Sequence, residues 1–123
     1  MRQTARFIST ASILATMLGA LSTTPQLVFA ADAQVVEEGK KIAFDRVKGN
    51  CLACHQIEGG ELPGNIGPAL VAMKVRFPDK GVLRAQIWDA TAKNPNTMMP
   101  PFGRHEILTA EEIDKVVEFI YSL

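Results

Sequence analysis

Apolar residues recur at helical spacing in three segments of the chain, residues 34–48, 79–92 and 109–123. The last segment has the strongest pattern, with apolar residues at positions i, i+3, i+4 and i+7, which are Ile113, Val116, Val117 and Ile120. No run shows the strict alternation that is typical of a β-strand. The pattern therefore predicts an all-α fold.

Polar residues mark where two of these helices begin. Thr109 and Glu112 have the spacing of a capping box, in which the Thr side chain caps a helical N–H and the Glu side chain reaches back to the Thr N–H. Asp79 is suited to begin the middle helix, since Asp is a favoured N-cap residue.

The first helix contains a glycine, Gly39, at a cost of about 1 kcal/mol relative to Ala. Its apolar side is supplied by Val35, Ile42, Phe44 and Val47. A glycine at this position indicates that another helix approaches closely, and a plain weak point in the helix is the alternative.

Two segments between the helices are rich in glycine and proline. Residues 56–78 predict a long loop with a short helical turn near residues 69–75. Residues 94–104 contain Pro95, Pro100 and Pro101, which fix φ and remove backbone donors, so a regular helix is excluded there. Long loops in small domains are usually functional.

The first thirty residues have the pattern of a secretory signal peptide. Arg2 and Arg6 form a basic start, residues 13–21 are an apolar run, and Val28 and Ala30 are small residues at positions −3 and −1 of a cleavage site. An uncleaved membrane anchor is the alternative, but the apolar run is shorter than the roughly 20 residues needed to span a bilayer. We therefore expect an exported, periplasmic domain of residues 31–123 that does not bind the membrane after cleavage.

The composition is that of an ordinary globular protein, with 47% apolar and 21% charged residues and a formal net charge of zero. Such a charge gives no electrostatic reason to expect nucleic acid as a partner. A mature domain this small has a modest core and usually needs a staple such as a disulfide, a metal or a large cofactor.

Cys51, Cys54 and His55 form a C-x-x-C-H motif, which is the attachment motif of c-type haem. Two thiols at this spacing lie on one turn and reach one edge of a porphyrin, where they form thioether bonds. The residue that follows presents an imidazole to the iron. We therefore predict one covalent haem c.

Two cysteines at this spacing also occur in three other kinds of site. A thioredoxin-like dithiol needs a preceding strand, which the pattern does not predict. A zinc site needs four ligands, and the sequence has two histidines, His55 and His105, fifty residues apart. A disulfide between Cys51 and Cys54 would close a very short loop and stabilise the fold little.

The second axial ligand has four candidates, Met73, Met98, Met99 and His105. A methionine ligand raises the reduction potential and suits electron transfer. We prefer Met99, because Pro100 and Pro101 fix its backbone direction. For Met73 the alternative of core packing is favoured, and bis-histidine ligation through His105 remains open.

Three more residues are predicted to bind the cofactor. A haem-ligating histidine normally donates its other ring N–H to a carbonyl, and we assign that carbonyl to Pro68, thirteen residues after His55. Leu70 would pack against the porphyrin. The indole N–H of Trp88 is suited to meet a haem propionate, although a core tryptophan is an equal alternative.

In its order of elements the mature chain resembles the class I cytochrome c fold. An N-terminal helix, C-x-x-C-H, the G-P-x-L stretch of residues 67–70, a methionine loop and a C-terminal helix follow one another. The resemblance implies that the first and last helices cross near Gly39 and an aromatic residue, Phe119 or Tyr121. Phe44 lies seven residues before Cys51, where that family usually has an aromatic about four residues before, so a longer or kinked connection at residues 47–50 is implied.

The stretches CLACHQIEGGE, NPNTMMPPFGRH and LTAEEIDKVVEFIYSL are similar to the SoxX family, the monohaem subunit of the periplasmic SoxAX sulfur-oxidation complex. The resemblance implies axial ligation by Met99 and a heterodimer with the SoxA cytochrome. It also implies that thiosulfate is joined oxidatively to a cysteine of the SoxYZ carrier, by an L-cysteine S-thiosulfotransferase in which this chain has no catalytic residue. Electrons would then pass to a downstream cytochrome.

Three functions are compatible with the predicted haem site. The first is the electron-transfer subunit of a thiosulfate-oxidising enzyme, and the second is a free-standing soluble cytochrome c that carries electrons in the periplasm. The third, a sensor of gases or small ligands, requires that Met99 leave the iron, because ligation by both His55 and Met99 saturates it.

Overall fold

The computed structural model describes residues 26–123, and side chains from Asp32 onward. Its elements are helices and short 3₁₀ turns, with no strand among the described residues, so the predicted all-α fold is confirmed. The predicted signal peptide lies mostly outside the described residues, and its cleavage after Ala30 stays a prediction. None of the helices within residues 26–123 combines the length and the apolar content of a membrane-spanning segment.

Helix α1 spans Gln26–Phe44 and ends earlier than predicted from the sequence. The Asp45 carboxylate accepts the N–H of Val47 at 2.7 Å, and the Gly49 N–H donates to the Ile42 carbonyl at 3.2 Å, so the chain turns instead of continuing as a helix. Val47 was expected on the apolar side of a helix, and this was wrong, since it lies in the turn with 92% of its surface exposed.

The middle helix is also shorter than predicted. Helix α3 spans Lys80–Trp88 and is capped as expected by Asp79, whose carboxylate accepts the Gly81 N–H at 2.7 Å. Asp89 then adopts an extended backbone, and its side chain caps the separate 3₁₀ turn η2, Ala90–Ala92. The short helix α2, Met73–Arg76, falls where the sequence predicted a helical turn.

Helix α4, Ala110–Tyr121, begins at the predicted capping box. The Glu112 N–H donates to Thr109 Oγ1 at 3.1 Å, and the Glu112 carboxylate accepts the Thr109 N–H at 3.1 Å. The buried side of α4 consists of Ile113, Val116, Val117, Phe119 and Ile120.

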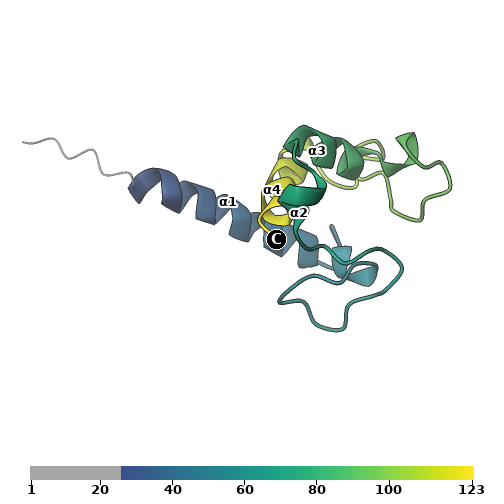
Figure 1. Ribbon diagram of the computed structural model, residues 1–123, viewed down its shortest axis with the longest axis horizontal. Coiled ribbons are helices and arrows are strands. Elements are labelled where there is room, and N and C mark those ends of the chain that lie inside the picture. The colour runs from purple at the N-terminus through teal and green to yellow at the C-terminus, as the bar shows by residue number, and fades with distance from the viewer. Residues whose placement is uncertain (1–25) are drawn as a thin grey trace, which may run out of the picture.

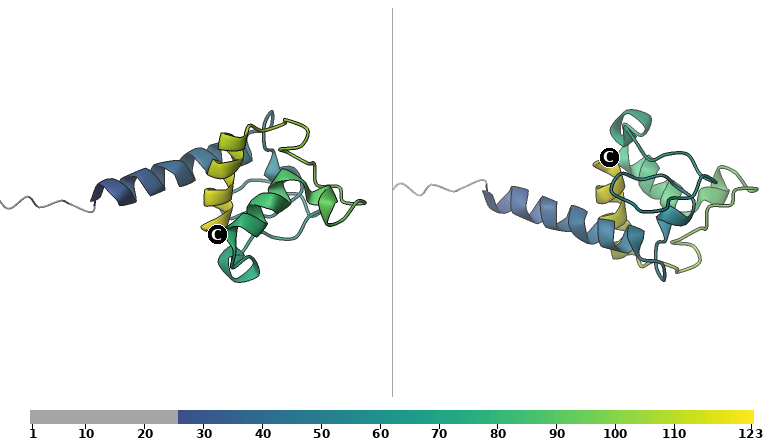
Figure 2. Two further views of the ribbon diagram at one scale, coloured as in Figure 1. Left: turned by 90° about the horizontal axis from the view of Figure 1, so that it is seen from above. Right: turned by 90° about the horizontal axis from the view of Figure 1, so that it is seen from below.

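Helices α1 and α4 cross at Gly39, as the resemblance implied (Figures 1 and 2). A Cβ atom on Gly39 would lie 2.0 Å from the backbone oxygen of Lys115 and 3.0 Å from the Cβ of Phe119. The rings of Phe44 and Phe119 meet edge to face next to this crossing, with their centroids 5.7 Å apart. Phe119 is therefore the aromatic residue at the crossing.

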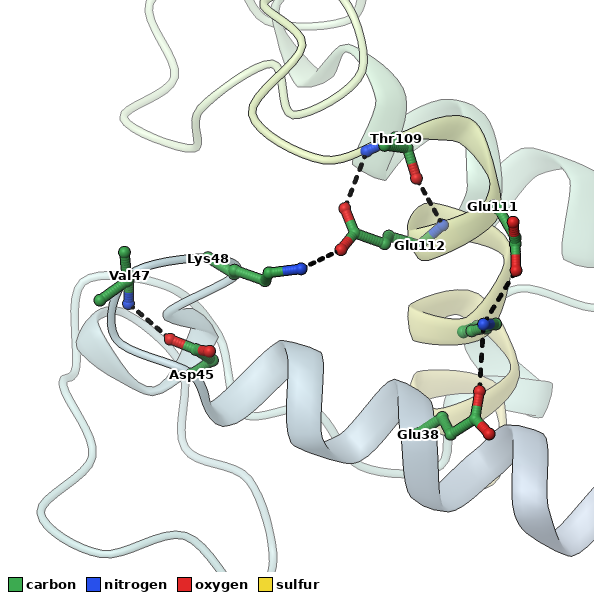
Figure 3. A network of polar contacts seen from close by, with 8 residues as sticks. Glu38, Asp45, Val47, Lys48, Thr109, Glu111 and Glu112 are labelled. Atoms are coloured by element: carbon green, nitrogen blue, oxygen red, sulfur yellow. Dashed lines mark hydrogen bonds and ion pairs between the residues drawn. The ribbon is translucent and has the colours of Figure 1, made fainter.

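Ion pairs connect the outer surfaces of the two crossing helices (Figure 3). Lys115 of α4 bonds Glu38 of α1 at 3.0 Å and Glu111 at 2.9 Å. Lys48, in the turn after α1, bonds Glu112 of the capping box. This bond from Lys48 holds the pKa of Glu112 below its ordinary value. The turn that leads to the cysteines is thus attached to the start of α4.

Gly39→Ala should destabilise the holoprotein, because the added Cβ would overlap the Lys115 backbone. We expect the free energy of unfolding in urea to fall by about 2 kcal/mol. The matched control is Gly81→Ala on α3, where the nearest atom to the new Cβ is a side-chain oxygen of Asp79 at 3.0 Å. The control should stay within about 1 kcal/mol of wild type. Equal effects of the two substitutions would contradict a close crossing at Gly39.

Candidate functional site

Cys51, Cys54 and His55 lie on one tight turn, η1 (Cys51–Ala53) with the residues that follow it. The His55 N–H donates to the Cys51 carbonyl at 2.9 Å, and the Cys54 N–H donates to the same oxygen at 3.2 Å. Asn50 enters the turn with φ of 45°, in the left-handed region, which Asn tolerates better than most residues. The kinked connection expected before Cys51 is therefore present.

Both cysteines are free thiols, and both face the same cavity. Burial raises the pKa of the Cys51 thiol to about 11. No disulfide joins Cys51 and Cys54 in the structure. Within residues 26–123 no cluster of three His, Cys, Asp or Glu side chains is arranged to hold a metal ion.

His55 is oriented by the loop that contains Pro68. Its Nδ1 lies 2.7 Å from the Pro68 carbonyl oxygen, the contact expected from the sequence. Since a carbonyl only accepts, Nδ1 carries the proton and Nε2 keeps its lone pair for a ligand. Gly67 lies flat against the ring, where a Cβ would come within 2.4 Å of Cε1. The imidazole is thus fixed in position and in tautomer.

Backbone bonds join the same loop to the cysteine turn on both sides of His55. The Gly67 N–H donates to the Cys54 carbonyl at 2.8 Å, and the Leu70 N–H donates to the Gln56 carbonyl at 2.9 Å. The Arg76 guanidinium of α2 donates to the Ala69 carbonyl at 2.8 Å. Sequence reasoning missed Arg76, because no motif marks a side chain that reaches back seven residues to a loop carbonyl.

A cavity of about 690 Å³ opens beside this turn. Its volume is in the range of cofactor and ligand pockets, 300–1,000 Å³. Its walls are largely apolar core residues from the helices and loops, including Met73, Leu83, Ile87, Phe102, Leu108, Val116 and Ile120. Among the predicted cofactor-binding residues, Cys51, Cys54, His55, Pro68, Leu70 and Met99 line it.

Met98 and Met99 both line the cavity, but they differ in environment. Met99 is half-buried and packs against the hydrophobic core, and its N–H donates to Thr97 Oγ1 at 3.2 Å. Met98 has 72% of its surface exposed. Met73 is 1% exposed and belongs to the core, and His105 is exposed and does not line the cavity.

Trp88 is the predicted cofactor-binding residue that the structure places elsewhere. It does not line the cavity and instead packs beneath Gly103, where a Cβ would lie 2.2 Å from the ring atom Cδ2. The contact with Gly103 is a packing contact, and a contact of Trp88 with a propionate stays a prediction. The sequence left both roles open, because the distance between the helix and the later loop depends on the tertiary fold.

The donor set fits a c-type haem. Two thiols, an imidazole with a free lone pair and a thioether surround one apolar cavity. Three cationic side chains also line it, Arg46, Lys48 and Arg76, and among the described residues the lining includes no carboxylate. This charge suits a cofactor that carries two propionates.

The family profile of cytochrome c matches residues 36–123. The chain belongs to the cytochrome c family. Membership implies an electron-transfer domain with covalent haem c, and it agrees with the two free cysteines on one turn.

The structure is also similar to a chain of SoxXA from P. pantotrophus, with a TM-score of 0.63 and 31% identity over 70% of this chain and 79% of that chain. This confirms the class I cytochrome c fold and the resemblance to the SoxX family. An uncharacterised lipoprotein of Aquifex aeolicus (strain VF5) is 35% identical over 76 residues, which are 61% of this chain. The chain spans 37% of the length of that relative.

Replacing both Cys51 and Cys54 by Ala should leave a largely unfolded protein, because covalent attachment of the haem would be lost. At about 24 cal/mol per Å³, a void of the size of the cavity would cost at most about 17 kcal/mol, which exceeds the stability of a typical domain. Far-ultraviolet circular dichroism should show little helix and no cooperative melting. A helical variant that melts cooperatively would contradict a core completed by haem.

Proposed function

We propose that this protein is the monohaem electron-transfer subunit of a periplasmic complex of the SoxXA type. The observation that carries the proposal is the similarity to a chain of SoxXA over 79% of its length, at 31% identity. The cytochrome c family profile, which matches residues 36–123, includes every residue that lines the cavity where a c-type haem fits.

In this proposal Cys51 and Cys54 would hold the haem through two thioether bonds, and His55 and Met99 would bind its iron. When bound, haem supplies a ferric/ferrous couple that takes up and releases one electron. With two protein side chains on the iron, no position would remain open for a substrate, which would suit electron transfer and not catalysis.

The side chains around the cavity would keep the proposed ligands in place when the haem gains or loses an electron. Pro68 keeps the Nδ1 proton of His55 in place, at 2.7 Å, which preserves the orientation and basicity of the imidazole. Leu70 and the buried side chains of Leu83, Ile87 and Val116 exclude water from the site. A rigid, dry site needs little rearrangement when an electron arrives.

Sulfur chemistry would take place on other chains. Cys51 and Cys54 are the two cysteines of this chain, and both are used to attach the haem. We propose that a SoxA cytochrome partner holds the catalytic site, where thiosulfate is joined to a cysteine of the SoxYZ carrier. This chain would accept the electrons released and pass them to a downstream cytochrome.

A free-standing periplasmic cytochrome c that carries electrons between larger complexes is the second candidate. The two candidates differ in whether the chain forms a stable complex with a second protein. We expect the native chain, purified at physiological ionic strength, to elute with a second haem protein in a stable complex. Isolation as a monomer from cells that oxidise thiosulfate would favour the free shuttle and contradict the subunit.

Met99→Ala should abolish the methionine-to-ferric-haem charge-transfer band, because the thioether that binds the iron is removed. Met98→Ala is the matched control, since Met98 lies next in the chain but is largely exposed. The control should keep the band. Survival of the band in Met99→Ala and its loss in Met98→Ala would show that Met98, and not Met99, binds the iron.

A further inference from the structure

Trp88, at the end of α3, contacts the far side of the loop that carries Met99. Gly103 packs on the indole so closely that a Cβ there would lie 2.2 to 2.7 Å from three ring atoms. The N–H groups of Gly103 and Arg104 both donate to the Trp88 carbonyl, at 3.0 and 3.3 Å. The indole ring and the backbone carbonyl of Trp88 thus both contact the loop at Gly103.

Arg104 strengthens this contact by reaching past Trp88 to the turn η2. Its guanidinium donates to Thr91 Oγ1 at 3.2 Å and pairs with Asp89 at 3.4 Å. The pKa of Asp89 is lowered, mainly by the hydrogen bond from Thr91 and to a smaller extent by the pair with Arg104. We call the contacts of Trp88 with Gly103 and Arg104 the loop anchor.

The segment between Met99 and the loop anchor is short and stiff. It consists of Pro100, Pro101 and Phe102, and the two prolines fix φ. Phe102 is buried, and its carbonyl accepts the N–H groups of Ile107 at 2.9 Å and Leu108 at 3.1 Å. Few backbone angles are therefore free to change between Gly103 and Met99.

We infer that Trp88 is a positioning residue for Met99, and that the loop anchor sets how readily the thioether leaves the iron. A thioether is a weak ligand, so the free energy of its bond depends strongly on how far the loop is preorganised. The inference rests on the proposed ligation by Met99. It gives Trp88 a role in the site without contact with the cofactor.

The test is the affinity of the ferric holoprotein for imidazole, which competes with Met99 for the iron. Binding is followed by loss of the methionine charge-transfer band. In Gly103→Ala the backbone φ lies outside the left-handed region, so the indole ring is the main obstacle to the new Cβ. We expect imidazole to bind about tenfold more tightly, which corresponds to about 1.4 kcal/mol.

Trp88→Leu should likewise tighten imidazole binding several-fold, and Trp88→Phe, which keeps an aromatic face, should have a smaller effect. In the double variant the clash is removed, so Gly103→Ala should add less than about twofold to the effect of Trp88→Leu, as expected for residues in contact. Val82→Ala is the control on the same helix, at a residue that does not line the cavity. It should leave imidazole affinity unchanged.

Two results would overturn the positioning role. One is imidazole affinity within twofold of wild type in Trp88→Leu, even where thermal stability falls. The other is a full effect of Gly103→Ala in the Trp88→Leu background. If Gly103→Ala does not accumulate as holoprotein, the imidazole affinities of Trp88→Leu and Trp88→Phe alone test the positioning role. Absence of the charge-transfer band in the wild-type protein would instead refute ligation by Met99, which separates the two failures.

Discussion

More than half of the buried core residues in the described chain also line the cavity, among them Leu83, Ile87, Val116 and Ile120. Helices α3 and α4 therefore direct their apolar sides toward the cavity as well as toward each other. In a domain of this size the apolar area available for burial is small. A large apolar cofactor supplies the missing contacts, so folding and haem binding depend on the same side chains.

The close crossing of α1 and α4 makes this arrangement possible. Gly39 lets the two backbones approach, and Phe44 packs edge to face on Phe119 beside it. The turn that follows α1 then delivers Cys51 and Cys54 to the edge of the cavity whose wall includes Val116 of α4. The first helix thus places the attachment points, and the last helix forms the wall they face.

The features that the sequence predicted correctly depend on residues close together in the chain. The capping box of Thr109 and Glu112 and the cap at Asp79 involve neighbours two or three residues apart. The end of α1 at Phe44 was not predicted although the Asp45–Val47 bond that marks it is also local, because the apolar Val47 fits the helical pattern and favoured a longer helix. The position of Trp88 beneath Gly103 could not be predicted for a different reason, since fifteen residues separate them and their contact depends on the tertiary fold.

The two sides of the proposed site are held in different ways. On the His55 side, backbone bonds join the loop of residues 67–70 to the cysteine turn. On the Met99 side, prolines and the loop anchor at Trp88 hold the chain. The first arrangement bonds the residues next to His55 directly, whereas the second holds the chain at Gly103 and Arg104, which lie beyond the prolines that follow Met99. The Met99 side is thus expected to open more readily than the His55 side.

The central claim, one haem attached covalently through Cys51 and Cys54, is tested most directly by the intact mass of the protein made in a host that matures c-type cytochromes. Mass spectrometry under denaturing acid should show the polypeptide plus one haem, and the double Cys→Ala variant should lack that addition. A wild-type polypeptide at its unmodified mass would contradict the account.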